Sequence, residues 1–146
     1  KKEAYYFYRK FYFTGKPIHF SGTQNDKNFR LFRRSKCRYV ADKKVHETLI
    51  VKGTTGILKN KLLHYSFDNF EQFKKKMLYY GLLKGSELAD KGKKYSIITH
   101  WSKVAFKFVK TYFLKLGFLD GFDGLKISYL QSLYVNETYR KLKNSK

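Results

Sequence analysis

The sequence predicts an α+β fold in which short strands come first and three helices follow. Over residues 1–66, aromatic runs and alternating apolar and basic residues indicate strands, whereas from Ser66 onward apolar residues recur at helical spacing. The 146 residues are 42% hydrophobic and 19% aromatic, which supplies a folded core and excludes a disordered chain. We therefore expect one unit over 1–146, strand-rich over 1–66 and helical over 67–146.

Segments with the composition of strands account for the first part. The aromatic run from Tyr5 to Phe13 suits a strand, and Gly15-Lys16-Pro17 ends it. The segment from Phe29 to Arg33 alternates apolar and basic residues, as a half-buried strand does. Two further apolar runs, 48–51 and 57–63, flank a glycine-bearing turn and predict a pair of strands joined by that turn.

The second part predicts three helices. Asp68 and Glu71 have the spacing of a capping box, so the first helix should begin there and end near residue 92. A second helix is expected from about residue 100 to the glycine at 117, and a third over 124–142. Strands followed by helices lack the strand, Gly-rich turn and helix that open a nucleotide-binding α/β unit.

A net charge of +21 is the strongest compositional signal. It favours a polyanionic partner, namely nucleic acid, an anionic membrane face or a phosphorylated substrate, although lysine is also common as a solvated surface residue. The single Cys37 excludes an internal disulfide and indicates a reducing compartment. No apolar run approaches the roughly 20 residues that span a bilayer. We expect a cytoplasmic protein, peripheral at most on the inner face of the membrane.

Two short motifs contain candidate reactive side chains. Val45-His46-Glu47 lies between strand-like segments, where a carboxylate beside a histidine can serve as a general base; a solvated glutamate beside a loop histidine gives the same pattern. His64 follows an apolar run and precedes a helix, a position that favours binding groups in α/β folds. A lone histidine there is also a common structural residue. No pair of histidines or acids has metal-binding helical spacing, so a zinc site is not expected.

Two segments of the helical part carry further signals. The run 117–124 holds three glycines with Asp120 and Asp123, which suits a tight interhelical turn capped by one of the acids. The segment Trp101–Leu116 is basic and amphipathic, with Trp and Phe on its apolar side. Such a helix can lie on an anionic membrane surface, or it can be a core helix whose lysines face water.

An ordered series of motifs extends through most of the chain, from about Tyr5 to Leu142. It comprises Arg30-Leu31-Phe32-Arg33-Arg34, Val45-His46-Glu47, the glycine-bearing segment 53–56, His64-Tyr65-Ser66, the helical run with Phe70 and Lys74 to Tyr80, and Gly117-Phe118-Leu119-Asp120-Gly121 with Gly124. This series resembles the C-terminal half of family-two bacterial glycosyltransferases that build lipopolysaccharide core and related surface glycans.

The resemblance implies the C-terminal portion of a GT-A, Rossmann-like fold and an inverting transfer of sugar from a nucleotide donor to a glycan or glycolipid acceptor. It implies that Glu47 is the base and that His46 orients it or contacts the acceptor. Arg30 and Arg33 would neutralise phosphate, and His64 would face the donor diphosphate or its metal. Asp120 joins this expected substrate-binding set.

The resemblance also implies a divalent cation, Mn²⁺ or Mg²⁺, held by an Asp-x-Asp pair. No Asp-x-Asp occurs in the sequence, so we expect that pair, with the nucleotide-binding half, upstream of Lys1. Two other functions stay open. A nucleic-acid-binding module is favoured by aromatic and basic interleaving over 5–13 and 30–38, but no known binding motif accompanies it. A non-catalytic membrane-surface domain would also suit the charge.

Overall fold

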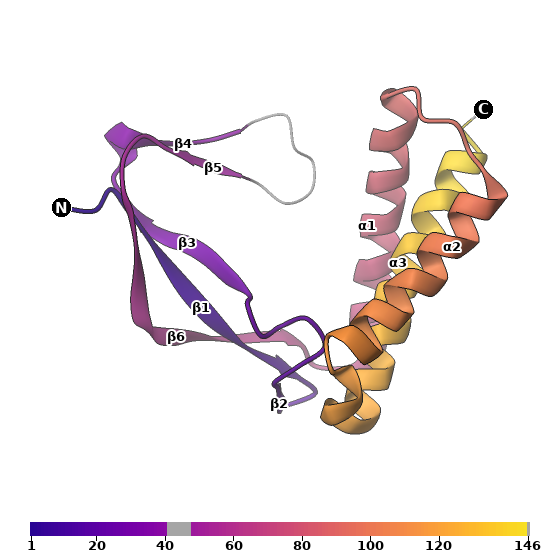
Figure 1. The fold of residues 1–146 in the computed structure, drawn as a ribbon, viewed down its shortest axis with the longest axis horizontal. Coiled ribbons are helices and arrows are strands. Elements are labelled where there is room, and N and C mark those ends of the chain that lie inside the picture. The colour runs from indigo at the N-terminus through magenta and orange to yellow at the C-terminus, as the bar shows by residue number, and fades with distance from the viewer. Residues whose placement is uncertain (41–47, 146) are drawn as a thin grey trace.

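The computed structural model describes residues 1–40 and 48–145 and has a strand part and a helical part side by side (Figure 1). The fold is mixed α and β, and the predicted order of strands before helices is confirmed. The strands are β1 (Ala4–Phe13), β2 (Lys16–Ile18), β3 (Lys27–Phe32), β4 (Cys37–Tyr39), β5 (Leu49–Val51) and β6 (Thr55–Phe67). The main helices are α1 (Phe70–Asp90), α2 (Ile97–Val109) and α3 (Gly121–Lys143).

Strand β1 is the centre of the larger sheet. Its first half pairs antiparallel with β3, and its last three residues pair antiparallel with β2. Strand β6 runs parallel to β1, from Ala4 opposite Thr55 to Phe13 opposite Phe67, with two register shifts on the way. The aromatic side chains of β1 suit this position because flat rings pack well across neighbouring strands: Tyr12 stacks on Tyr65 with ring centroids 4.7 Å apart.

The predicted pairing of 48–51 with 57–63 is wrong. Strand β5 pairs antiparallel with β4, and Val40 N donates to Thr48 O next to the Tyr39–Leu49 pair. Strand β6 instead pairs with β1, from which it is separated by more than forty residues in sequence. An apolar run marks a strand but does not specify its partner, and the long aromatic β1 offers β6 more pairing surface than the three-residue β5 does.

The first helix is capped one residue later than predicted. Asn69, rather than Asp68, accepts a hydrogen bond from Gln72 N at 2.9 Å, and the Gln72 side chain accepts one from Asp68 N at 3.1 Å. This reciprocal arrangement has the logic of a capping box, with Asn and Gln in place of Asp68 and Glu71. Helix α1 then ends near the predicted position, at Asp90.

The second helix begins earlier than predicted, because Ser96 caps it and Thr99 N donates to the serine hydroxyl. Helix α2 passes into a π-helical turn, η2 (Lys110–Leu114), and a 3₁₀ turn, η3 (Gly117–Asp120), leads into α3. Gly117 and Gly124 touch at this junction: a Cβ on Gly124 would lie 1.8 Å from Gly117 O. The glycine-rich run is therefore a close backbone crossing.

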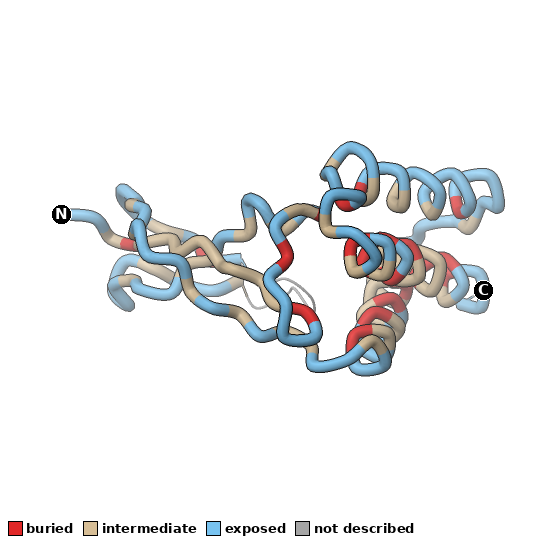
Figure 2. The backbone as a smooth tube through the Cα atoms, turned by 90° about the horizontal axis from the view of Figure 1, so that it is seen from below, coloured by how far each residue is buried: buried red, intermediate tan, exposed pale blue. Residues whose placement is uncertain are grey.

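The core lies where the ends of the strands meet α1 and α3. Its buried side chains are Phe13, Ile18, Phe73, Met77, Ile127 and Leu130. Buried positions are concentrated along the helices, whereas most of the strand part is exposed or half-buried (Figure 2). Helices α1 and α3 approach closely because Gly81 and Gly85 carry no side chain at their contact: a Cβ on Gly85 would lie 2.6 Å from Thr138 O.

Candidate functional site

His64 lies near the end of β6 beside two charged residues. The guanidinium of Arg9, on β1, donates from Nε and Nη2 to the two carboxylate oxygens of Asp26 at 2.8 Å each. The Nη1 atom of the same arginine lies 3.4 Å from His64 Nε2. Because β1 and β6 are neighbours in the sheet, their side chains on one face meet the loop that carries Asp26. The fold thus builds an Asp26–Arg9–His64 cluster.

This environment keeps His64 neutral. An arginine can only donate, so the nitrogen facing Arg9 accepts and the imidazole proton lies on Nδ1. Burial lowers the pKa of His64, and the positive charge of Arg9 lowers that pKa further. Asp26 opposes the shift, while Lys76 and Arg30 add to it. The result is a neutral imidazole among cations, an environment that suits phosphate oxygens.

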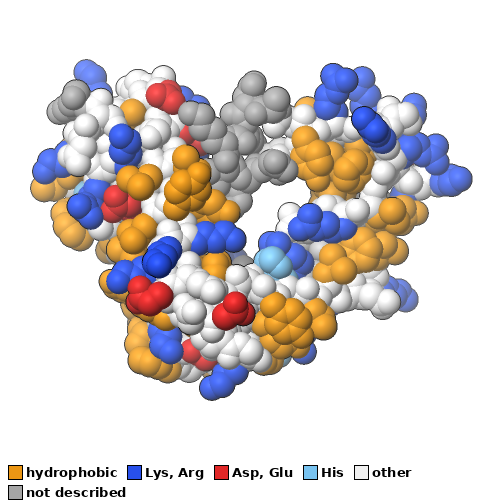
Figure 3. Space-filling view, turned by 180° about the vertical axis from the view of Figure 1, so that it is seen from behind, with side chains coloured by type: hydrophobic (Ala, Val, Ile, Leu, Met, Phe, Trp, Pro, Cys, Tyr) orange, Lys and Arg blue, Asp and Glu red, His pale blue; other side chains and the backbone are white. Residues whose placement is uncertain are grey.

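A cavity of about 440 Å³ adjoins the cluster. Asp26 lines it together with the polar side chains of Ser21, Thr23, Asn25 and Gln131, and Phe11 and Phe73 provide apolar walls. Polar groups converging between aromatic walls fit a small hydroxyl-bearing ligand. Figure 3 shows the molecule hollowed between the strand part and the helical part, with Lys and Arg side chains at the edge.

The two predicted arginines differ in their surroundings. Arg30 is exposed on β3 and acts electrostatically on His64, so these two predicted residues share one neighbourhood. Arg33 follows β3 and forms an ion pair with Glu3, with Nε 3.3 Å from the carboxylate. The structure therefore places Arg30 within electrostatic range of His64 and holds Arg33 near the N-terminus of β1. The predicted base Glu47 and its neighbour His46 lie outside the described residues.

Asp120 has a clear place in the fold. Its carboxylate accepts from His19 N at 3.0 Å, from Phe20 N at 3.0 and 3.2 Å, and from the Ser21 hydroxyl at 2.7 Å. It precedes α3, but its side chain makes no capping bond to that helix. The carboxylate instead joins the loop after β2 to the start of α3, across the two parts of the molecule. The substrate-binding role expected of Asp120 stays a prediction.

Sequence reasoning missed the partners of His64, because Arg9 and Asp26 are 55 and 38 positions away and only the sheet brings them together. It also missed His100, which is buried. Tyr95 Oη lies 3.2 Å from His100 Nδ1, and Asn136 Oδ1 lies 3.0 Å from Nε2. The ring stacks on Tyr139, with centroids 5.4 Å apart. These contacts make His100 a connector between α2 and α3.

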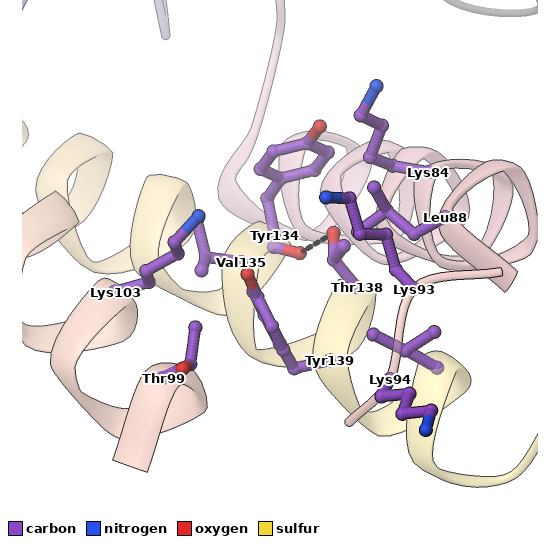
Figure 4. Close-up of a pocket in the computed structure, with 11 residues that line it drawn as sticks. Lys84, Leu88, Lys93, Lys94, Thr99, Lys103, Tyr134, Val135, Thr138 and Tyr139 are labelled. Atoms are coloured by element: carbon purple, nitrogen blue, oxygen red, sulfur yellow. Dashed lines mark hydrogen bonds between the residues drawn. The ribbon is translucent and has the colours of Figure 1, made fainter. Parts of the chain in front are cut away.

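A second cavity, of about 390 Å³, lies between the three helices (Figure 4). Lys84, Lys93, Lys94 and Lys103 line it beside Tyr134 and Tyr139. Lys84 is paired with Glu87 at 2.9 Å, and the ammonium of Lys103 lies 5.9 Å from the Tyr139 ring centre. These lysines belong to three different segments, so their convergence was not readable from the sequence.

The described residues do not fit a divalent cation. Over 1–40 and 48–145, no group of three His, Cys, Asp or Glu side chains could hold one. The His64 Nε2 atom faces the Arg9 guanidinium, so this nitrogen is not available to a metal ion. The two roles considered for His64, facing the donor diphosphate or its metal, stay predictions.

No known family matches the sequence, and no solved structure is similar enough to be matched. Within the described part of the chain, no helix combines the length and apolar character needed to cross a bilayer. The function must therefore be argued from the residues and their arrangement.

Proposed function

We propose that this chain is the acceptor-side part of an inverting glycosyltransferase, which transfers a sugar from a nucleotide donor to a cell-surface glycan or lipid-linked acceptor at the inner face of the membrane. The observation that carries the proposal is the Asp26–Arg9–His64 cluster beside a polar cavity. A nucleotide-sugar has two recognisable ends, a diphosphate and a hydroxyl-rich ring. Lys76 and Arg30, whose positive charges act on His64, suit the first, and the cavity offers hydroxyl and amide groups to the second.

The cationic side of the cluster suits the leaving group. In an inverting transfer the acceptor hydroxyl attacks the anomeric carbon, the bond to the diphosphate breaks, and negative charge grows on the departing phosphate. Arg30 is exposed and its positive charge acts on His64, so it would attract that growing charge, whereas Arg9 is held in place by Asp26. A neutral His64 can donate from Nδ1 to a phosphate oxygen. These groups would stabilise the leaving group electrostatically.

The proposal gives Glu47 the proton transfer. The attacking oxygen must lose its proton as it bonds to the anomeric carbon, and the Glu47 carboxylate would accept that proton. His46 would orient the carboxylate or contact the acceptor. The motif lies between β4 and β5, the strands of the small hairpin. The divalent cation expected for the complete enzyme would be held by residues outside those described, and no step above depends on it.

The test uses the enzyme produced from the complete reading frame that contains these 146 residues. It is incubated with UDP- and GDP-sugars and a bacterial glycolipid extract, and release of nucleoside diphosphate is measured. We expect acceptor-dependent release from one donor class, reduced at least tenfold by Arg30→Gln. Lys59→Gln, an exposed change on β6, is the control and should leave turnover unchanged. Absence of release with every donor, or equal effects of the two variants, would contradict the proposal.

A further inference from the structure

We infer that the outer face of α2, together with η2, η3 and the start of α3, docks on the surface of an anionic lipid bilayer. The face is called the docking face below and is defined by its exposed apolar side chains. These are Ile97, Ile98, Trp101, Phe106, Val109, Phe113, Leu114, Leu116, Phe118, Leu119, Phe122, Leu125 and Tyr129. The docking face continues from the amphipathic segment 101–116 across the junction between the helices and onto α3.

Helix α2 exposes an apolar row in place of the polar face that a surface helix normally presents. Ile98 and Trp101 are 79% and 58% exposed, and Val109 continues their row at helical spacing. The opposite side of the helix is packed, because His100 and Thr111 are buried against α3. Since the packed side already satisfies the fold, the exposed row is not explained by the chain's own core.

The exposed apolar row continues on α3. Phe122, Leu125 and Tyr129 follow each other at helical spacing, with Phe122 70% exposed. At the junction, Leu116 adopts the left-handed backbone conformation, with φ of 56°, and leaves 40% of its surface exposed. That conformation costs a non-glycine residue roughly 1 kcal/mol.

A groove between α2 and α3 opens on the same face. It has a volume of about 470 Å³, and its lining is mainly apolar, with Val104, Phe108 and Leu133 among the side chains. Trp101 and Tyr129, at its edges, are both amphipathic rings of the kind that lie at the boundary between headgroups and acyl chains. The groove thus adds apolar contact area to the docking face without adding charge.

Lysine side chains lie beside the exposed apolar residues. The ammonium of Lys110 lies 5.8 Å from the centre of the exposed Phe106 ring, and the segment 97–116 contains no Asp or Glu. Lys126, over the Phe122 ring at 4.7 Å, supplies a cation to the α3 portion. A band of ammonium groups beside an apolar face is complementary to a bilayer with anionic headgroups above its acyl chains.

This charge pattern favours lipid over other occupants. A second copy of the chain would bring its own lysines against these, and like charges at close range oppose association. A nucleic acid would satisfy the lysines but leave the isoleucine and leucine side chains uncovered, because bases stack on aromatic rings. Among these partners, an anionic bilayer alone covers both kinds of surface.

The chain's single tryptophan makes the test direct, because Trp101 belongs to the docking face. The 146-residue chain is mixed with vesicles of phosphatidylcholine alone or with phosphatidylglycerol, and Trp101 fluorescence and co-sedimentation are recorded. We expect a blue shift, quenching by lipids brominated on the acyl chain, and at least tenfold stronger binding to the anionic vesicles. Unquenched fluorescence, or equal binding to both compositions, would overturn the inference.

Matched variants locate the contact. Ile98→Asp and Phe122→Asp should each weaken vesicle binding about tenfold or more, since each removes an exposed apolar group from the face. Leu63→Asp, equally charged and also exposed but on β6, is the control and should bind as the wild type does. Equal loss in all three variants would contradict the inference. A second contradicting result would be a dimer in sedimentation velocity that Phe122→Asp dissociates, together with no binding of the wild type to vesicles.

Docking is separable from sugar transfer. Glu47→Gln should bind vesicles as the wild type does, because Glu47 is not among the side chains that define the docking face. A chain that binds anionic vesicles but releases no nucleoside diphosphate in the complete enzyme would refute the proposed function and leave the docking inference standing. The converse result would refute docking alone.

Discussion

The Asp120 carboxylate joins the two parts of the molecule, so replacing it tests how the fold is held together. Its oxygens accept from two backbone amides, at His19 and Phe20, and from the Ser21 hydroxyl at 2.7 Å. Hydrogen bonds to a charged group contribute about 1.5–3 kcal/mol each, although their contributions are not additive. Asp120→Asn keeps one accepting oxygen and turns an NH₂ group toward the remaining donors. We therefore expect a loss of about 2–4 kcal/mol in the free energy of unfolding.

The assay is urea unfolding followed by circular dichroism, with thermal unfolding as a second readout. For a domain of this size the loss corresponds to a fall of roughly 5–15 °C in Tm. Asp123→Asn is the matched control: its carboxylate pairs with Lys126 on the same helix at 3.4 Å, a contact worth at most about 1 kcal/mol. If both variants unfold at the same urea concentration as the wild type, Asp120 does not hold the junction and the reasoning is refuted.

Two further stability predictions follow from the structure. Burial and Arg9 lower the pKa of His64 in the folded state. As the pH falls below about 6.5, the unfolded chain therefore takes up this proton before the folded chain does. The free energy of unfolding decreases until the pH reaches the lower pKa of the folded state. In His64→Gln, the urea midpoint should therefore decrease less between pH values above and below about 6.5 than it does in the wild type. The same pH dependence in both proteins would contradict this prediction. Gly124→Ala should lower the free energy of unfolding by more than Gly92→Ala does. The new Cβ at position 124 would clash with Gly117 O. At Gly92 a Cβ has open space, and only the left-handed φ opposes it, at a cost of roughly 1 kcal/mol. Equal unfolding midpoints for the two variants would show that the crossing at Gly124 is looser than described.

Local signals in the sequence were sufficient for the longer strands and the helices, but not for the short strands β2 and β4 or for the pairing of the strands. The aromatic run over 5–13 predicts a strand, and the spacing of apolar residues after Ser66 predicts helices. The structure has β1 at the first place and α1, α2 and α3 after the second. Helix α1 ends close to the expected position, while its cap lies one residue later than expected, at Asn69, whose side chain accepts from Gln72 N. The partner of β6 depends on a parallel pairing with β1, which no local pattern specifies.

The candidate site shows the same division. His64 and Arg30 were predicted from separate motifs, and the sheet brings them into one electrostatic neighbourhood. Arg9 and Asp26 belong to no motif, so their role beside His64 could not be anticipated. For Asp120, the short-range pattern suggested a cap, but its actual hydrogen-bond partners are about 100 residues away. Long-range contacts of this kind follow from tertiary packing alone.

The central claim is that this chain supplies the acceptor-side chemistry of an inverting sugar transfer, and the most direct measurement is turnover of the complete enzyme carrying Glu47→Gln. The matched control is Glu71→Gln, whose side chain is exposed on α1 beside Lys74. The proposal predicts that Glu47→Gln lowers nucleoside diphosphate release by about 10²–10⁴-fold with donor affinity unchanged, while Glu71→Gln retains wild-type turnover. Full turnover with Glu47→Gln would contradict it.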